Sequence, residues 1–248
     1  MHKFLGPDLI WDSDYRYKLL LRGVKRYLGT AVQRKAPITP RLLLRMVHLL
    51  DFDKPLHVAM WALFLVAFYS FLRKSNLVVD SAAHISPKVL LRSDLCFDAS
   101  FAYLTIRSSK TIQFQERLFS LPLPRIPGSL FCPVAALVDN LRINQVPKDM
   151  PLFSVRSASS LSHMTYTHFS SFLARVIKAV GLDSARYSPH SFRCGGATFT
   201  FEAKVPSELI TAQGDWRSDC CLIYLEMTDR QKRLAATHMA AAISHIAV

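Results

Sequence analysis

One stretch of the sequence has to be buried in whatever structure the chain adopts. Residues 55–72 contain no lysine, arginine, aspartate or glutamate, and the run VAMWALFLVAFYSFL is nearly all apolar. A membrane-spanning helix needs about 20 apolar residues. This run is shorter, and it includes His57 near its start and Tyr69 and Ser70 near its end. The pattern favours a buried core helix, and a membrane-associated protein that uses this segment is the alternative.

The composition indicates a globular protein with a polyanionic partner. The 248 residues suffice for one large domain or two modest ones, and a hydrophobic content of 50% excludes wholesale disorder. Lysine and arginine number 31 against 18 aspartate and glutamate residues, which gives a net charge of +13. An excess of this size points most often to nucleic acid and less often to an anionic membrane surface.

The cysteines argue against a disulfide or zinc scaffold. They are odd in number, form no CxxC pair and have no spacing to histidine of the kind that zinc needs. A reducing compartment is therefore expected. Residues 1–12 lack the sustained apolar core of a secretory signal, so none is expected there.

The pattern along the chain predicts mostly helices and one small sheet. A basic helix is expected within residues 14–35, a second helix after a Thr39 cap and Pro40, and the apolar helix at 55–72. Short β-rich runs at 94–98, 101–109 and 116–123 predict an antiparallel sheet with a turn near 110–115. Helical segments follow at 132–144, 167–181, from 188 onward, at 205–213, at 218–226 and at the C-terminus. The predicted fold class is mainly α with a small antiparallel β-sheet (α+β).

Four short motifs carry residues that suit phosphate chemistry, although each alone has an ordinary explanation. Arg73 in FLRKSNL could simply complement the C-terminal end of the apolar helix, and Lys110 in IRSSKTIQF could be a solvated lysine in a turn. Trp216 and Tyr224 in GDWRSDCCLIYLE could be core aromatics.

The fourth motif, YSPHSFRCGGAT, predicts the start of a helix. Ser188 is expected as the N-cap and Pro189 in the first turn, so that His190 and Arg193 share one face near the helix N-terminus. That end of a helix attracts phosphate. An ordinary capped helix with polar surface residues is the alternative explanation.

In combination these motifs resemble the catalytic set of a known family. An arginine, a hairpin lysine, the HxxR pair, a tryptophan and a tyrosine follow one another as in the tyrosine recombinase (phage integrase) family, over about residues 35–230. The amino-acid sequence of residues 190–219 most resembles that of the branch found in eukaryotic mobile elements such as DIRS-like retrotransposons and Cryptons.

The resemblance implies cleavage and rejoining of DNA strands through a covalent 3′-phosphotyrosyl intermediate, as in site-specific recombination or integration of a mobile element. Tyr224 would be the nucleophile, and Lys110 would protonate the departing 5′ oxygen. The phosphotyrosyl bond conserves the energy of the phosphodiester bond that is broken. The resemblance therefore implies no ATP, cofactor or essential metal.

The other residues of the set would act on the phosphate itself. Arg73 and Arg193 would hold the non-bridging oxygens through planar, permanently charged groups. His190 would assist as an acid or base, and Trp216 would donate its indole N–H to the phosphate.

The chain departs from the family's pattern at three points. Family members usually carry an acidic residue three positions after the first arginine, where this chain has Asn76. The tryptophan-to-tyrosine interval is one residue shorter than in many members, so Asp215 competes with Trp216 for the fifth position. Only about 35 residues precede the catalytic region, where the family normally has a helical DNA-clamping domain.

The resemblance also implies a domain layout, partners and a location. Residues 1–35 would be the tail of the DNA-clamping domain, 36–230 the catalytic domain, and 231–248 a C-terminal helix for exchange between protomers. The expected partner is double-stranded DNA, bound by a homo-oligomer, with no membrane and no small-molecule substrate. The expected location is the nucleus in a eukaryote and otherwise the cytoplasm. A catalytically inactive, truncated DNA-binding remnant and a type IB topoisomerase-like nicking activity remain alternatives.

Overall fold

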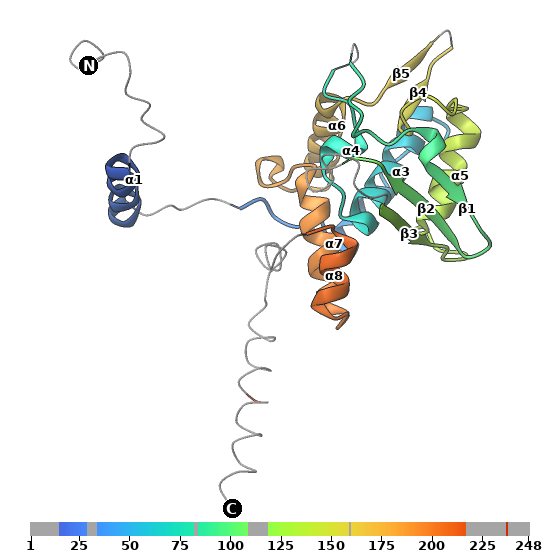
Figure 1. Ribbon diagram of the computed structural model, residues 1–248. Coiled ribbons are helices and arrows are strands. Elements are labelled where there is room, and N and C mark those ends of the chain that lie inside the picture. The colour runs from blue at the N-terminus through green and yellow to red at the C-terminus, as the bar shows by residue number, and fades with distance from the viewer. Residues whose placement is uncertain are drawn as a thin grey trace, which may run out of the picture. The chain divides into compact units, whose positions relative to one another are not determined.

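A computed structural model describes residues 15–28, 34–81, 84–108, 119–158, 160–216 and Thr237 (Figure 1). The chain divides into two compact units, Met1–Arg34 and Lys35–Val248. In the first unit the structure describes helix α1 (Tyr15–Leu28) and Arg34. All other elements belong to the second unit.

The predicted apolar helix is α3 (Pro55–Ser70), and it is buried on all sides. It runs alongside α5 (Pro133–Asn144) and α7 (His190–Glu202) in the interior of the second unit (Figure 1). The prediction of a core helix is therefore confirmed. Among the described residues, none of the helices has both the length and the apolar character needed to cross a membrane.

A cluster of phenylalanines joins three helices in the core. Phe64 of α3 stacks on Phe192 of α7, with ring centroids 4.9 Å apart and an angle of 28° between the rings. Phe169 and Phe172 of α6 (Tyr166–Ala179) lie 6.0 and 6.2 Å from the Phe64 ring. Aromatic side chains of this size contribute most of the buried apolar area at such a junction.

The predicted antiparallel sheet is present, with strand order β1 (Leu95–Phe97), β2 (Phe101–Ile106) and β3 (Phe119–Pro124). Leu104 of β2 lies opposite Leu95 and Leu121, and the three side chains are buried. The predicted turn at 110–115 lies outside the described residues. A second, two-stranded sheet of β4 (Ser154–Arg156) and β5 (Leu161–His163) was not predicted.

Short elements connect these layers. They are α2 (Pro40–Val47), α4 (Lys74–Leu77), the 3-10 turns η1 (Arg92–Asp94) and η2 (Ser184–Arg186), and α8 (Ser207–Gln213). Thr39 caps α2 as predicted, because its side-chain oxygen accepts the N–H of Leu42 at 3.2 Å. The helix predicted at 218–226 lies outside the described residues, as does the C-terminal one apart from Thr237.

The predicted start of α7 is wrong by one residue. The helix begins at His190, and its N-cap is Pro189, whose φ of −50° and ψ of −30° are already helical. No side-chain hydrogen bond caps the helix, so the predicted capping by Ser188 is not seen. The bond runs the other way: the N–H of Ser188 donates to the hydroxyl of Ser191 inside the helix at 3.1 Å.

Two adjacent glycines let α7 approach its neighbours closely. A Cβ atom on Gly195 would lie 1.8 Å from the carbonyl oxygen of Ile38, and one on Gly196 would lie 2.0 Å from that of Phe68. Real Cβ atoms never come so near to backbone. The GG pair of the HSFRCGGAT motif therefore seats α7 against α3 and the segment that leads into α2.

We expect Gly196→Ala to destabilise the fold, because α7 has to move away from α3. Overpacking of this kind typically costs about 1–3 kcal/mol, more than the gain in helix propensity of about 1 kcal/mol. Urea unfolding followed by circular dichroism measures the change. Gly23→Ala in α1 is the control, since nothing lies within 4 Å of its added Cβ. An unchanged midpoint for Gly196→Ala would contradict the packing argument.

Candidate functional site

Four of the six predicted site residues lie in the described part of the chain. Arg73 precedes α4, His190 and Arg193 lie in the first turn of α7, and Trp216 follows α8. Lys110 and Tyr224 lie outside the described residues, so the structure does not place them. Figure 1 shows the end of α3, α4 and α7 in one region of the second unit.

Arg73 is half-buried at the N-cap position of α4. The chain reaches it through Phe71, which ends α3 in the left-handed conformation with a φ of 52°. A phenylalanine in that region costs about 1–3 kcal/mol and persists only where the surroundings enforce it. Among the residues that the structure describes, no hydrogen bond or ion pair of the Arg73 guanidinium is seen.

Arg193 is buried, with 2% of its surface exposed. Its guanidinium donates hydrogen bonds to the carbonyl oxygens of Phe71 and, at 3.0 Å, Gly214. The first carbonyl ends α3 and the second ends α8, so one side chain ties the ends of two helices together. The family resemblance implied a phosphate contact for this residue but not these backbone contacts.

Trp216 packs against Arg193. The guanidinium carbon lies 3.9 Å from the centroid of the indole. The rings of Phe71 and Trp216 are tilted against each other, with their centroids 6.0 Å apart. Trp216 is 6% exposed. Asp215, its competitor for the fifth position, is half-buried and has a φ of 49°. The left-handed turn at Asp215 brings the chain back so that the indole covers the guanidinium.

His190 is exposed at the start of α7, beside the two arginines. Its pKa is lowered from the usual value, first because neighbouring protein removes part of its water and then by the positive charges of Arg193 and Arg73. The lowered pKa favours the neutral form of the imidazole. The effect of both arginine charges on His190 shows that the three side chains lie near one another. The hydrogen bond from Arg193 to the carbonyl oxygen of Phe71, two residues before Arg73, links the same segments.

Asn76 is a part of the site region whose contacts the sequence did not reveal. Its side chain is 1% exposed and donates to the carbonyl oxygens of Lys88 at 3.0 Å and Ser108 at 2.9 Å. It makes no side-chain hydrogen bond to Arg73, which the family's acidic residue at this position suggested. These contacts could not be predicted from the sequence, because no residue spacing marks which backbone carbonyl oxygens a buried amide will bond.

The cluster suits an anion rather than a metal. Two permanent positive charges and the N-terminal end of α7 lie together, and both attract phosphate. In the part of the chain that the structure describes, no three histidine, cysteine, aspartate or glutamate side chains lie close enough to hold a metal ion.

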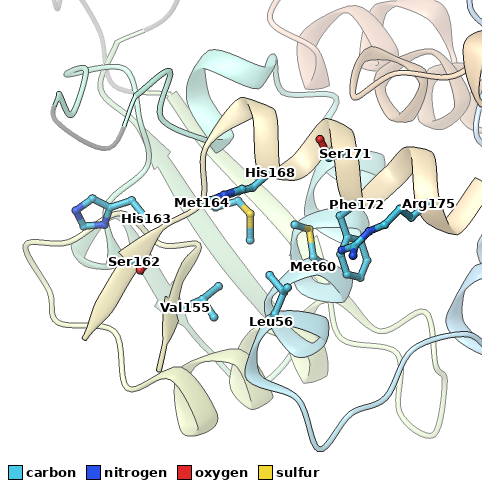
Figure 2. A pocket seen from close by; sticks show the side chains of 10 residues that line it. All are labelled: Leu56, Met60, Val155, Ser162, His163, Met164, His168, Ser171, Phe172 and Arg175. Carbon is cyan, nitrogen blue, oxygen red and sulfur yellow. The ribbon is translucent and has the colours of Figure 1, made fainter. Parts of the chain in front are cut away.

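A separate cavity of about 240 Å³ lies between α3, the β4–β5 hairpin and α6 (Figure 2). None of the four predicted site residues that the structure describes lines it. Figure 2 shows an apolar interior, built from Leu56, Met60, Val155, Met164 and Phe172, with Arg175 and His168 at its edge. The cavity is distinct from the arginine cluster.

Comparisons with known proteins show likeness in structure but not in sequence. The sequence matches no family model and no curated protein sequence. The fold is similar to that of XerH site-specific recombinase in a post-cleavage complex with its palindromic difH substrate, with a TM-score of 0.60 and 14% identity over 93% of this chain. The chain spans only 66% of that XerH chain.

Two further solved structures have a similar fold. XerA recombinase matches with a TM-score of 0.57 and 18% identity, over 90% of this chain and 74% of XerA. The Tn1549 transposon integrase in complex with circular intermediate DNA matches with a TM-score of 0.55 and 13% identity, over 89% of this chain and 74% of the integrase chain. The chain therefore has the fold of the tyrosine recombinase catalytic domain, mainly helical with a small antiparallel sheet.

Proposed function

We propose that this protein cleaves and rejoins DNA strands through a covalent 3′-phosphotyrosyl intermediate, in site-specific recombination or integration. One observation carries the proposal: three segments far apart in sequence, which carry Arg73, the His190–Arg193 pair and Trp216, meet at one place in a recombinase fold. Structures of XerH and of the Tn1549 integrase with DNA support the choice of substrate.

The two arginines differ in setting and in their proposed roles. Arg73 is half-buried and would contact a non-bridging phosphate oxygen directly. Arg193, fixed by Phe71 and Gly214 under the Trp216 ring, would provide a positive charge that does not have to reorient during the reaction. Preorganised charge in a site that excludes water stabilises a transition state more than the same charge in solvent.

The proposed chemical step moves two protons and exchanges one bond. The Tyr224 oxygen attacks the phosphorus, the bond from phosphorus to the 5′ oxygen breaks, and a phosphotyrosyl bond forms. The tyrosine proton goes to a base, for which the neutral His190 is the candidate, and Lys110 protonates the departing 5′ oxygen. Each substrate bond broken is replaced by one to the enzyme, so no external energy source enters the step.

The remaining parts of the proposal concern assembly and origin. Double-stranded DNA fits the net charge of +13, and a homo-oligomer would assemble on it. Residues 1–35 would belong to a clamp, and 231–248 would join protomers. A place in the DIRS-like and Crypton branch, and with it the nucleus, is part of the proposal.

Tyr224→Phe is expected to abolish the covalent adduct with a nicked or suicide duplex, while fold and DNA affinity persist, because only one oxygen is removed. A denaturing gel detects the adduct. Tyr103→Phe in β2 is the matched control and should form the adduct normally. An adduct that persists in Tyr224→Phe would assign the nucleophile elsewhere. No adduct in the unchanged protein would favour the inactive DNA-binding remnant.

DNA affinity is expected to depend steeply on salt and little on base sequence, because the proposed contacts are to phosphates. The logarithm of the binding constant should fall by about 0.9 per neutralised phosphate for each unit of log salt concentration. Titrations of a labelled duplex at several salt concentrations measure the slope. A slope near zero would show that the net charge of +13 does not contribute to DNA binding.

The imidazole of His190 is expected to titrate below 6.5 in the DNA-free protein, and Arg73→Gln should raise its pKa. Removing a nearby positive charge makes protonation easier, which sets the sign. Nuclear magnetic resonance of the ring protons follows the titration. Arg175→Gln in α6 is the control and should leave His190 unchanged. An equal pKa in Arg73→Gln would mean that the two groups do not interact.

A further inference from the structure

We propose that Asn76 is a positioning residue that fixes the end of β2 against the turn that carries Arg73, and that this requires its amide donors. The inference rests on the proposed function, because the end of β2 leads to Lys110, the candidate acid. It predicts that the acidic residue usual in the family at this position would impair this particular chain.

The contacts of Asn76 settle the orientation of its amide. The groups facing it, at 3.0 and 2.9 Å, are the carbonyl oxygens of Lys88 and Ser108, which can only accept hydrogen bonds. The NH₂ group must face them, and each of its two hydrogens has one partner. The Asn76 carbonyl oxygen of the main chain also accepts the N–H of Leu90 at 2.9 Å. Asn76 thus joins α4 to two other segments.

The same short turn carries Arg73. The main-chain N–H of Asn76 donates to the carbonyl oxygen of Arg73 at 2.9 Å, so a single turn separates the two residues. Ser108 lies two residues before Lys110 in the sequence. The bond from Asn76 to Ser108 therefore connects the backbone at Arg73 with the backbone that leads to the lysine.

A second anchor holds β2 but does not reach this turn. Arg107 forms a bidentate ion pair with Asp94, with both N–O distances at 2.8 Å, and Asp94 also accepts the N–H of Leu91. This pair ties β2 to η1. Arg107 also donates to the carbonyl oxygen of Val89 at 3.3 Å. Of these two anchors, however, the Asn76 side chain is the one that bonds the residues after β2 to the turn that carries Arg73, so the ion pair does not replace its bond.

Asn76→Asp keeps the size of the side chain and removes both donors. A carboxylate would place negative oxygens against two carbonyl oxygens, which repel it in a buried site. The matched control is Asn140→Asp in α5. Asn140 is also buried and donates to a backbone carbonyl, that of Leu152 at 3.3 Å, but it belongs to neither α4 nor β2.

The first measurement does not depend on activity. Hydrogen–deuterium exchange of peptides that cover residues 107–112 should become roughly five- to tenfold faster in Asn76→Asp, the effect of losing one structural hydrogen bond. Asn140→Asp should leave these peptides unchanged, and Asn76→Ser, with one neutral donor, should fall between. Equal exchange in Asn76→Asp and the unchanged protein would overturn the inference.

The second measurement asks whether Asn76 acts through the lysine. Asn76→Asp should slow cleavage of normal DNA roughly 10- to 100-fold and leave DNA affinity unchanged. A substrate with sulfur in place of the bridging 5′ oxygen needs no acid, so it should restore cleavage in Asn76→Asp as in Lys110→Ala, but not in Arg73→Ala. Restoration in Lys110→Ala without restoration in Asn76→Asp would overturn the inference.

Failure of the proposed function gives a different result. If the unchanged protein forms no adduct, or if sulfur does not restore Lys110→Ala, the assignment of the reaction or of its acid is wrong. The exchange measurement still decides whether Asn76 holds the end of β2.

Discussion

The burial of one guanidinium organises this region of the protein. Arg193 is held by the carbonyl oxygens of Phe71 and Gly214 and covered by the indole of Trp216. A buried charge is stable only when it is well hydrogen-bonded, so the two helix ends have to stay where they are. A lysine could not replace it, because an ammonium lacks the planar group that reaches two carbonyls and stacks on a ring. The left-handed turns at Phe71 and Asp215 follow from the same constraint.

The core explains why those helix ends are rigid enough to carry a site. α3 is buried over its length, and its Phe64 contacts side chains of α6 and α7. Because α3 ends at Phe71, the position of its last turn sets the position of Arg73, two residues further on. The glycine pair of α7 brings Arg193 within reach of that turn. The packing of the core therefore determines the geometry of the site.

The predictions from sequence were most accurate where the signal was long and periodic. The apolar helix and the three strands of the sheet were predicted correctly, because burial and alternation are visible over many residues. The β4–β5 hairpin was missed, since three-residue strands are too short to show a period. The cap at Ser188 was predicted from residue type, but α7 begins at His190 with Pro189 as its N-cap, and the hydrogen bond there runs from the N–H of Ser188 to the Ser191 hydroxyl.

The sequence by itself determined the fold class, the excess of positive charge and the residue types available for phosphate chemistry. Tertiary structure alone decided which groups those residues contact. Arg193 bonds to a carbonyl 122 residues away in sequence, and Asn76 to one 32 residues away. Backbone carbonyls are the same at every position, so no residue pattern marks which of them will accept a bond. Periodicity encodes which faces are buried, whereas the partners of buried polar groups depend on how the packed segments finally meet.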